Sequence, residues 1–126
     1  MNLTDQAKLD LRPILPNVIV NDEMHPDEVF QNQTLRPILK LQHETIIRMT
    51  QEYIKNRKNI YHNLRAEQKS DYIKNTLLAD RMNSHELKEI IIGMFTLDEM
   101  EYYLENKSRI NKRIQALLFQ RMEGAV

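Results

Sequence analysis

The chain of 126 residues contains no cysteine and no tryptophan, and only two glycines and four prolines. Without cysteine it can form no disulfide, no thiolate zinc site and no cysteine nucleophile, and the composition agrees with a reducing compartment. So few glycines and prolines leave little turn chemistry for an all-β fold, which needs many tight corners. The sequence therefore favours helices, in a chain of ordinary single-domain size.

Long hydrophobic runs are absent as well. The longest apolar stretch, residues 90–95, is interrupted by Gly93 and is far too short to cross a bilayer of about 30 Å. Four charged residues interrupt positions 1–20, so that no signal-peptide hydrophobic region is visible. We expect a soluble, cytoplasmic protein.

The charges balance overall but are unevenly distributed. The chain has 18 basic and 18 acidic residues, yet residues 1–34 hold 2 Lys and Arg against 6 Asp and Glu, and residues 35–58 hold 6 against 2. One interpretation is that the acidic start lies on the basic helix. The other is that the basic face receives an anionic partner.

The pentapeptide LRPIL occurs twice, at 11–15 and 35–39. In the second copy we predict that Thr34 caps a long helix near 35–58, because a proline in the first turn sacrifices no helical hydrogen bond. In the first copy Pro16 follows directly and disfavours helical backbone at Leu15, so that only an aborted turn is expected. A single short repeat does not indicate a solenoid.

The remaining helices are predicted from their start signals and apolar periodicity. They cover 26 to about 33, roughly 64–81, 85 to about 94 after Ser84, and 97–122 after the capping box of Thr96 and Glu99. Together these elements predict an all-α fold, an irregular bundle of about four to five helices. Residues 1–25 would form a partly irregular N-terminal extension and 26–126 a single helical domain.

Catalytic signatures were sought without success. No Glu-x-x-His pair is available for a carboxylate-bridged metal centre, and His43-Glu44 and His85-Glu86 lack the second histidine of a zinc motif. Two glycines cannot build a phosphate loop or a nucleophile elbow. We therefore expect no metal, no cofactor and no catalytic residue.

Polar residues interrupt the predicted apolar faces. Gln42 lies in the middle of one face, Lys107 and Asn111 in the middle of another, and Asp80 on the inward side of the helix near 64–81. Buried polar groups are costly unless they are paired, so these residues form either a core network or the lining of a pocket. In a pocket, Arg36 and Lys107 would receive an anionic group.

Four stretches resemble a group of short bacterial proteins of unassigned function that are sometimes labelled "glyoxalase". They are FQNQTLRPILKLQ (30–42), YIKNRKNIY (53–61), IIGMFTLDEMEYYLEN (91–106) and INKR (110–113). The resemblance covers roughly residues 29–122 and implies a shared pattern of positions, without a role for them: 30–34, Arg36, Pro37, Gln42, Gly93, Asn111, Lys112 and Arg113. The residues do not support the label, because the βαβββ modules and metal ligands of glyoxalases are not visible.

Three functional hypotheses follow. The first is a small non-enzymatic helical protein that acts through a protein partner or through self-association. The second is a pocket for a small anionic molecule formed by Arg36, Gln42, Asp80, Lys107 and Asn111. The third, nucleic-acid binding, would use the basic residues of the predicted helix near 35–58, although zero net charge argues against it. These residues are Arg36, Lys40, Arg48, Lys55, Arg57 and Lys58.

Overall fold

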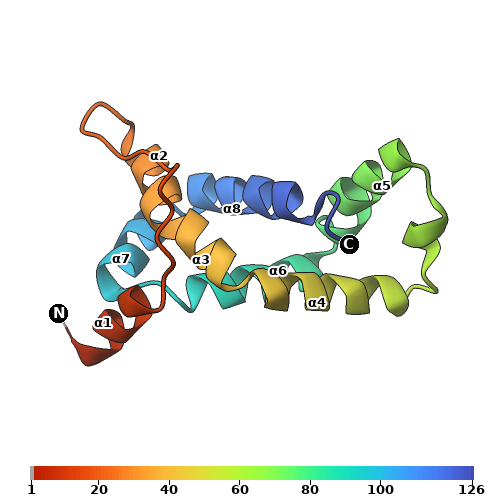
Figure 1. The fold of residues 1–126 in the computed structure, drawn as a ribbon, viewed down its shortest axis with the longest axis horizontal. Coiled ribbons are helices and arrows are strands. Elements are labelled where there is room, and N and C mark those ends of the chain that lie inside the picture. The colour runs from red at the N-terminus through yellow and green to blue at the C-terminus, as the bar shows by residue number, and fades with distance from the viewer. Residues whose placement is uncertain (1) are drawn as a thin grey trace.

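The computed structural model describes residues 2–126, and this part of the chain contains helices and no strands (Figure 1). The all-α prediction is confirmed. The α-helices are α1 (Leu3–Asp10), α2 (Pro26–Phe30), α3 (Arg36–Leu41), α4 (His43–Lys55), α5 (Ala66–Tyr72), α6 (Arg81–Ile92), α7 (Leu97–Glu105) and α8 (Lys107–Met122). Two π-helical turns, Gln31–Leu35 and Ile73–Leu77, join α2 to α3 and extend α5, and Ile60–Asn63 is a short 3₁₀ turn.

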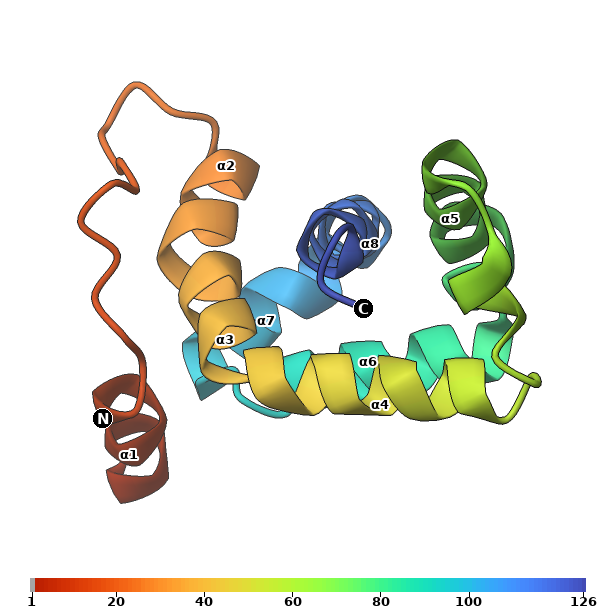
Figure 2. The ribbon, with the colours of Figure 1, turned by 45° about the vertical axis from the view of Figure 1, so that its right-hand side comes forward.

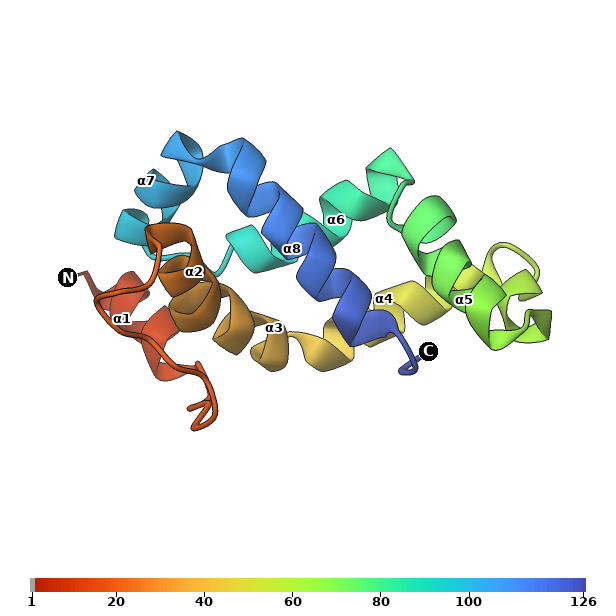
Figure 3. The same cartoon turned by 90° about the horizontal axis from the view of Figure 1, so that it is seen from above.

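Helix α8 lies at the centre of the fold. Seen nearly end-on, it is flanked by the α2–α3 helix on one side and by α5 on the other, with α4 and α6 beneath it (Figure 2). The view from above shows α8 running obliquely across the molecule, over α4 and α6 (Figure 3). Its fully buried residues Ile110, Ile114 and Leu118 follow the four-residue spacing of one helix face. This face anchors the core.

The two π-helical turns bring residues five apart onto one buried face. Phe30 and Leu35 are both buried, and so are Ile73 and Leu78. In an α-helix a spacing of five would turn the second side chain well away from the first, whereas a π turn widens the helix by one residue and realigns the face. The core can therefore continue from α2 into α3 and through the π turn that follows α5.

The number and bounds of the helices differ from the prediction of four to five. The long helix expected at 35–58 is wrong, because the helix already begins at Pro26, bends at Gln42 and ends at Lys55. The backbone at the bend has φ −94° and ψ 8° at Gln42. The helix expected at 97–122 also breaks, at Asn106 with φ −130° and ψ 27°. Both breaks fall on residues with polar side chains.

Helix starts were predicted with mixed success. The capping box of Thr96 and Glu99 is confirmed, with the Thr96 backbone N–H donating to the Glu99 carboxylate at 2.8 Å. Thr34 and Ser84 were wrong as caps, because both lie inside helices. The helix expected at 64–81 ends earlier, so that Asp80 is not inside a helix but caps α6.

The start of the chain contains a helix that the sequence analysis missed. Helix α1 covers Leu3–Asp10, and residues 11–25 then run without an α-helix to α2. The first LRPIL copy forms no helix, as Pro16 led us to expect. Among the described residues, no helix is long and apolar enough to cross a membrane.

Candidate functional site

The five residues proposed as a pocket are not brought together. Gln42 reaches the Ile90 carbonyl through its side-chain amide at 3.4 Å, and Asn111 accepts a hydrogen bond from the Tyr103 hydroxyl at 2.7 Å. Lys107 is exposed at the start of α8. Among the described residues, no hydrogen bond joins Gln42, Lys107 and Asn111. Neither the shared network nor the shared pocket is therefore seen.

Asp80 has a structural role at the start of α6. Its carboxylate accepts from the Asn83 backbone N–H at 3.1 Å, from the Tyr53 hydroxyl at 3.2 Å and from Arg57 at 3.3 Å. The Arg57 guanidinium also lies 3.5 Å from the centre of the Tyr53 ring, as a cation–π pair. The Asn83 backbone hydrogen bond is the main reason that the pKa of Asp80 is lowered. Asp80 thus ties α4 to α6.

Arg36, the fifth residue, lies in a groove between α3 and α8. Two adjoining cavities of about 240 and 370 Å³ share Arg36, Leu117 and Gln120 as lining residues. We call this the basic groove, because basic side chains from three segments line it: Arg36, His43, Arg109, Lys112, Arg113 and Arg121. Helix α8 supplies four of these and contains no acidic residue.

Several of these cations have no carboxylate partner. In the described part of the chain, the ion pairs involve Arg12, His25, Arg48, Arg57 and Arg109, and within the groove only Arg109 is neutralised, by Asp27 at 2.8 Å. Arg36, Arg113 and Arg121 make no ion pair there. Partial burial, together with the nearby charge of Arg36, lowers the pKa of Arg121. The groove therefore carries uncompensated positive charge.

Side chains other than carboxylates orient these guanidinium groups instead. Arg36 Nε donates to the Asn32 side-chain oxygen at 3.0 Å, Arg113 donates to Gln31 at 3.0 Å, and Arg121 lies 3.1 Å from His43 Nδ1. Each guanidinium has five N–H donors in a planar fork, so that further donors are left over. The arrangement holds three cationic forks in place and leaves most of their hydrogen-bonding capacity unused.

The acidic start of the chain does not lie on the basic residues of 35–58, contrary to one interpretation of the charge distribution. Asp27 pairs with Arg109 and accepts from the Tyr102 hydroxyl at 2.5 Å. These hydrogen bonds, Arg109 first, lower the pKa of Asp27 from 3.8 to about 2. The contact ties the start of α2 to α7 and α8.

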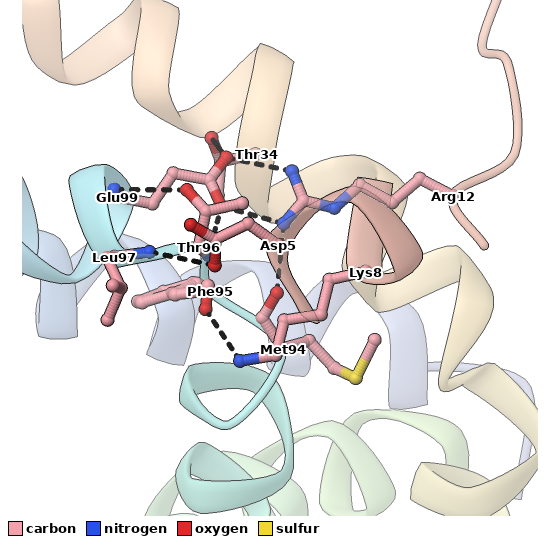
Figure 4. Close-up of polar contacts among 9 residues, drawn as sticks. All are labelled: Asp5, Lys8, Arg12, Thr34, Met94, Phe95, Thr96, Leu97 and Glu99. Carbon is pink, nitrogen blue, oxygen red and sulfur yellow. Dashed lines mark hydrogen bonds and ion pairs between the residues drawn. The ribbon is translucent and has the colours of Figure 1, made fainter. Parts of the chain in front are cut away.

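A second polar cluster surrounds the start of α7 (Figure 4). Glu99 accepts from Arg12 at 2.7 and 2.8 Å and from the Thr34 hydroxyl at 2.8 Å, in addition to its capping bond. Burial would raise the pKa of Glu99, but the hydrogen bonds from Arg12, Thr96 and Thr34 outweigh it and lower the pKa. This cluster fastens α1 and the residues after it to the end of α6.

The comparisons with known proteins were made for the whole chain. No protein-family model, no curated protein and no solved structure matches it. The resemblance to short bacterial proteins therefore stays a prediction.

The basic groove was missed by sequence reasoning, although one signal was present. Five basic residues and no acidic residue occur in 107–122, although basic residues toward the end of a helix are also favoured by the helix dipole alone. The meeting of Arg36 and Arg121 needs the fold, because 85 positions separate them.

Proposed function

We propose that this chain is a non-enzymatic binding protein that takes a small anionic ligand, phosphate-bearing or carboxylate-bearing, in the basic groove. The observation that carries the proposal is the pairing of like charges, Arg36 beside Arg121, without a carboxylate partner among the described residues. Like charges brought together destabilise a fold unless an anion joins them. A bound phosphate would satisfy both guanidinium groups at once.

The chemistry of the groove favours an oxyanion. Guanidinium forks bind phosphate and carboxylate oxygens through two parallel hydrogen bonds, which gives geometric selectivity as well as charge. Of the two cavities, the one of about 240 Å³ lies below the range of roughly 300–1,000 Å³ that is typical of pockets for drug-sized molecules, and the one of about 370 Å³ lies near its lower end. A compact anion or the charged end of a small metabolite therefore fits better than a large ligand.

The absence of a nucleophile beside a base supports a binding role. The groove holds one histidine, His43, and its Nδ1 faces the Arg121 guanidinium rather than a hydroxyl or a thiol. Catalysis of acyl or phosphoryl transfer needs a positioned base within hydrogen-bond reach of the reacting group. We accordingly place the protein among binding proteins, in the reducing compartment that its lack of cysteine fits.

Nucleic-acid binding through residues 35–58 receives less support. Arg48 is paired with Glu52 at 3.0 Å and Arg57 with Asp80 at 3.3 Å, so that two of the six cations are neutralised. The lining of the basic groove includes no Phe, Tyr or Trp on which bases could stack. Binding of a small anion needs only the unpaired cations of the groove, whereas nucleic-acid binding would also need a surface for the bases.

The test is a thermal-shift titration with sodium phosphate, pyrophosphate and citrate against sodium chloride of matched ionic strength. A ligand at about 100 times its dissociation constant adds roughly 2.7 kcal/mol of stability. We expect at least one of the three anions to raise the melting temperature of the native chain. Arg36→Gln and Arg121→Gln should each abolish most of this rise.

Arg48→Gln is the matched control, since it removes one exposed arginine charge outside the groove. It should keep the full response to the anion. An equal response in all three variants, or no response beyond that to sodium chloride, would contradict the proposal.

Self-association is a second proposal, and a different observation favours it. Large apolar side chains near the start of the chain are exposed, among them Leu3 at 90% and Ile14 at 91%. An interface that covered these side chains would remove their apolar surface from water, which favours association. Sedimentation across a wide concentration range tests it, and a strictly monomeric chain would argue against it.

A further inference from the structure

Residues 2–25, which we call the N-terminal arm, contribute nothing to the hydrophobic core. The core cluster begins at Phe30, and the buried residue of α1 is a charged one, Asp5. Figures 2 and 3 show α1 at the edge of the molecule and the following segment outside α2 and α3. Five large apolar side chains of the arm are exposed instead: Leu3 90%, Leu11 60%, Ile14 91%, Ile19 68% and Val20 45%.

Polar contacts fasten the arm at one place, which we call the socket (residues 94–99). Lys8 donates to the Phe95 carbonyl at 3.0 Å, and Arg12 donates to the Met94 carbonyl at 2.9 Å and to Glu99. Asp5 accepts from the Leu97 backbone N–H at 3.2 Å. Figure 4 shows these side chains, from α1 and from the residues just after it, converging on the residues between α6 and α7. The socket thus recognises two cations and one carboxylate at fixed positions.

The segment between the socket and α2 is long and weakly held. Residues 13–25 contain Pro13 and Pro16. Apart from His25, which caps α2, one hydrogen bond joins this described segment to the helices, from the Asn32 side chain to the Ile19 carbonyl. Fully extended, it spans up to about 40 Å. That reach is comparable to the size of a small domain, so that the arm can arrive at the socket of a neighbouring molecule.

We propose that two copies of this chain exchange their N-terminal arms, so that α1 of each occupies the socket of the other. Every contact between arm and socket is kept in the exchanged pair, because the same residues meet. The two segments 13–25 would then run past each other between the copies. Apolar side chains such as Ile14 and Ile19, which the single chain exposes, would be covered there, and this burial favours the pair.

This inference deepens the second proposal, self-association, and is independent of the basic groove. It commits to a second copy as the partner, since the arm already carries the charges that the socket accepts. Exchange also explains why an arm without any core residue retains five specific hydrogen bonds to the socket, two from α1 and three from Arg12.

The test uses the double variant Asp5→Cys, Leu97→Cys, because the chain has no cysteine of its own. The native chain is first sedimented to find a concentration at which dimers exist, and the variant is then oxidised briefly and run on a denaturing gel without reductant. Exchange predicts a covalent dimer. A closed chain predicts an internal disulfide and a product of monomer mass.

The experiment has two controls. Arg48→Cys, Glu52→Cys places both thiols one turn apart on α4 and should give the monomer product whatever the assembly. The single variants Asp5→Cys and Leu97→Cys, oxidised separately and after mixing, guard against misfolding of the double variant: exchange predicts covalent dimers several-fold more abundant in the mixture than in either alone. An excess in the mixture supports the proposal, and equal yields overturn it.

The outcomes also separate exchange from self-association. Dimers by sedimentation, with a disulfide product of monomer mass, would overturn exchange and leave self-association standing. Absence of any dimer up to millimolar concentration would overturn both. Covalent dimers that become several-fold fewer when Arg12→Gln is added would support exchange through this socket.

Discussion

The contact of Arg12 with Glu99 offers the sharpest test of how the arm is held. The two side chains are 7% and 16% exposed and are joined by two short hydrogen bonds. Arg12→Met keeps an apolar stem of similar length to the aliphatic part of arginine but removes the charge and the donors. Breaking a fully buried ion pair costs roughly 3–5 kcal/mol, because one charge remains without a partner.

Two features reduce that figure here. Glu99 keeps its hydrogen bonds from Thr34 and Thr96, and water can reach the carboxylate once the arm loosens. In addition, Arg12 Nε is the one buried side-chain nitrogen or oxygen among the described residues without a hydrogen-bond partner, so that its removal relieves a small cost. We therefore expect Arg12→Met to lower the free energy of unfolding by about 2 kcal/mol.

Urea denaturation followed by far-ultraviolet circular dichroism measures this loss. With a slope of about 2 kcal/mol per molar urea, the midpoint should fall by about 1 M. Arg48→Met is the matched control, because its ion pair with Glu52 is exposed and such pairs contribute about 0.3–0.5 kcal/mol. If the two variants lost equal stability within about 0.5 kcal/mol, the socket contact would be no stronger than a surface pair, and the reasoning would be refuted.

Two further predictions concern Asp27 and Thr96. The lowered pKa of Asp27 means that its contribution to stability is complete above about pH 3.8 and is lost as the pH falls through about 2. The stability deficit of Asp27→Asn, measured by denaturation from pH 7 to 2, should therefore shrink toward pH 2, and a constant deficit would contradict the ion pair. Thr96→Ala removes the cap of α7 and should cost about 1 kcal/mol, whereas the exposed Thr45→Ala within α4 should cost nothing. Equal effects would refute the capping role.

What could be predicted from the sequence depended on how local the signal was. The box of Thr96 and Glu99 lies within four residues and was found, as was the helix start at Pro26. Asp80 and Ser84 are both good caps by local criteria, and Ser84 was chosen wrongly. The Asp80 carboxylate is held by Tyr53 of α4 and by Arg57 in the turn after α4, both distant in sequence. No short window of sequence contains that information.

The breaks in the two long helices have the same origin. Gln42 and Asn106 are tolerated inside helices, and the apolar periodicity continues across both, so that the pattern predicts unbroken helices. In the structure, Asn106 donates to the Tyr102 carbonyl at 2.8 Å, a backbone group near the end of α7. The Gln42 side chain reaches the Ile90 carbonyl on α6. Such side chains form hydrogen bonds with backbone groups that have no partner within their own helix, at the bend or near the end of a neighbouring helix.

Asn111 provides a last prediction, in which the single variants and their combination differ. The hydroxyl of Tyr103, a residue that is 4% exposed, donates to Asn111 at 2.7 Å, and burial raises the pKa of this tyrosine. Asn111→Leu leaves the hydroxyl without its acceptor and should cost about 1–3 kcal/mol, since a buried polar group then lacks a partner. Tyr103→Phe leaves the Asn111 amide unpaired but half-exposed, so that water can replace the hydroxyl and the cost should stay below about 1 kcal/mol. Removing both partners should restore most of the loss of Asn111→Leu, because no polar group is then left buried alone. Denaturation of the four chains gives the coupling energy. If the double variant were destabilised by the sum of the two single losses, the hydroxyl and the amide would not be energetically coupled. The hydrogen bond to Tyr103 would then not be the reason that a polar residue is found at position 111.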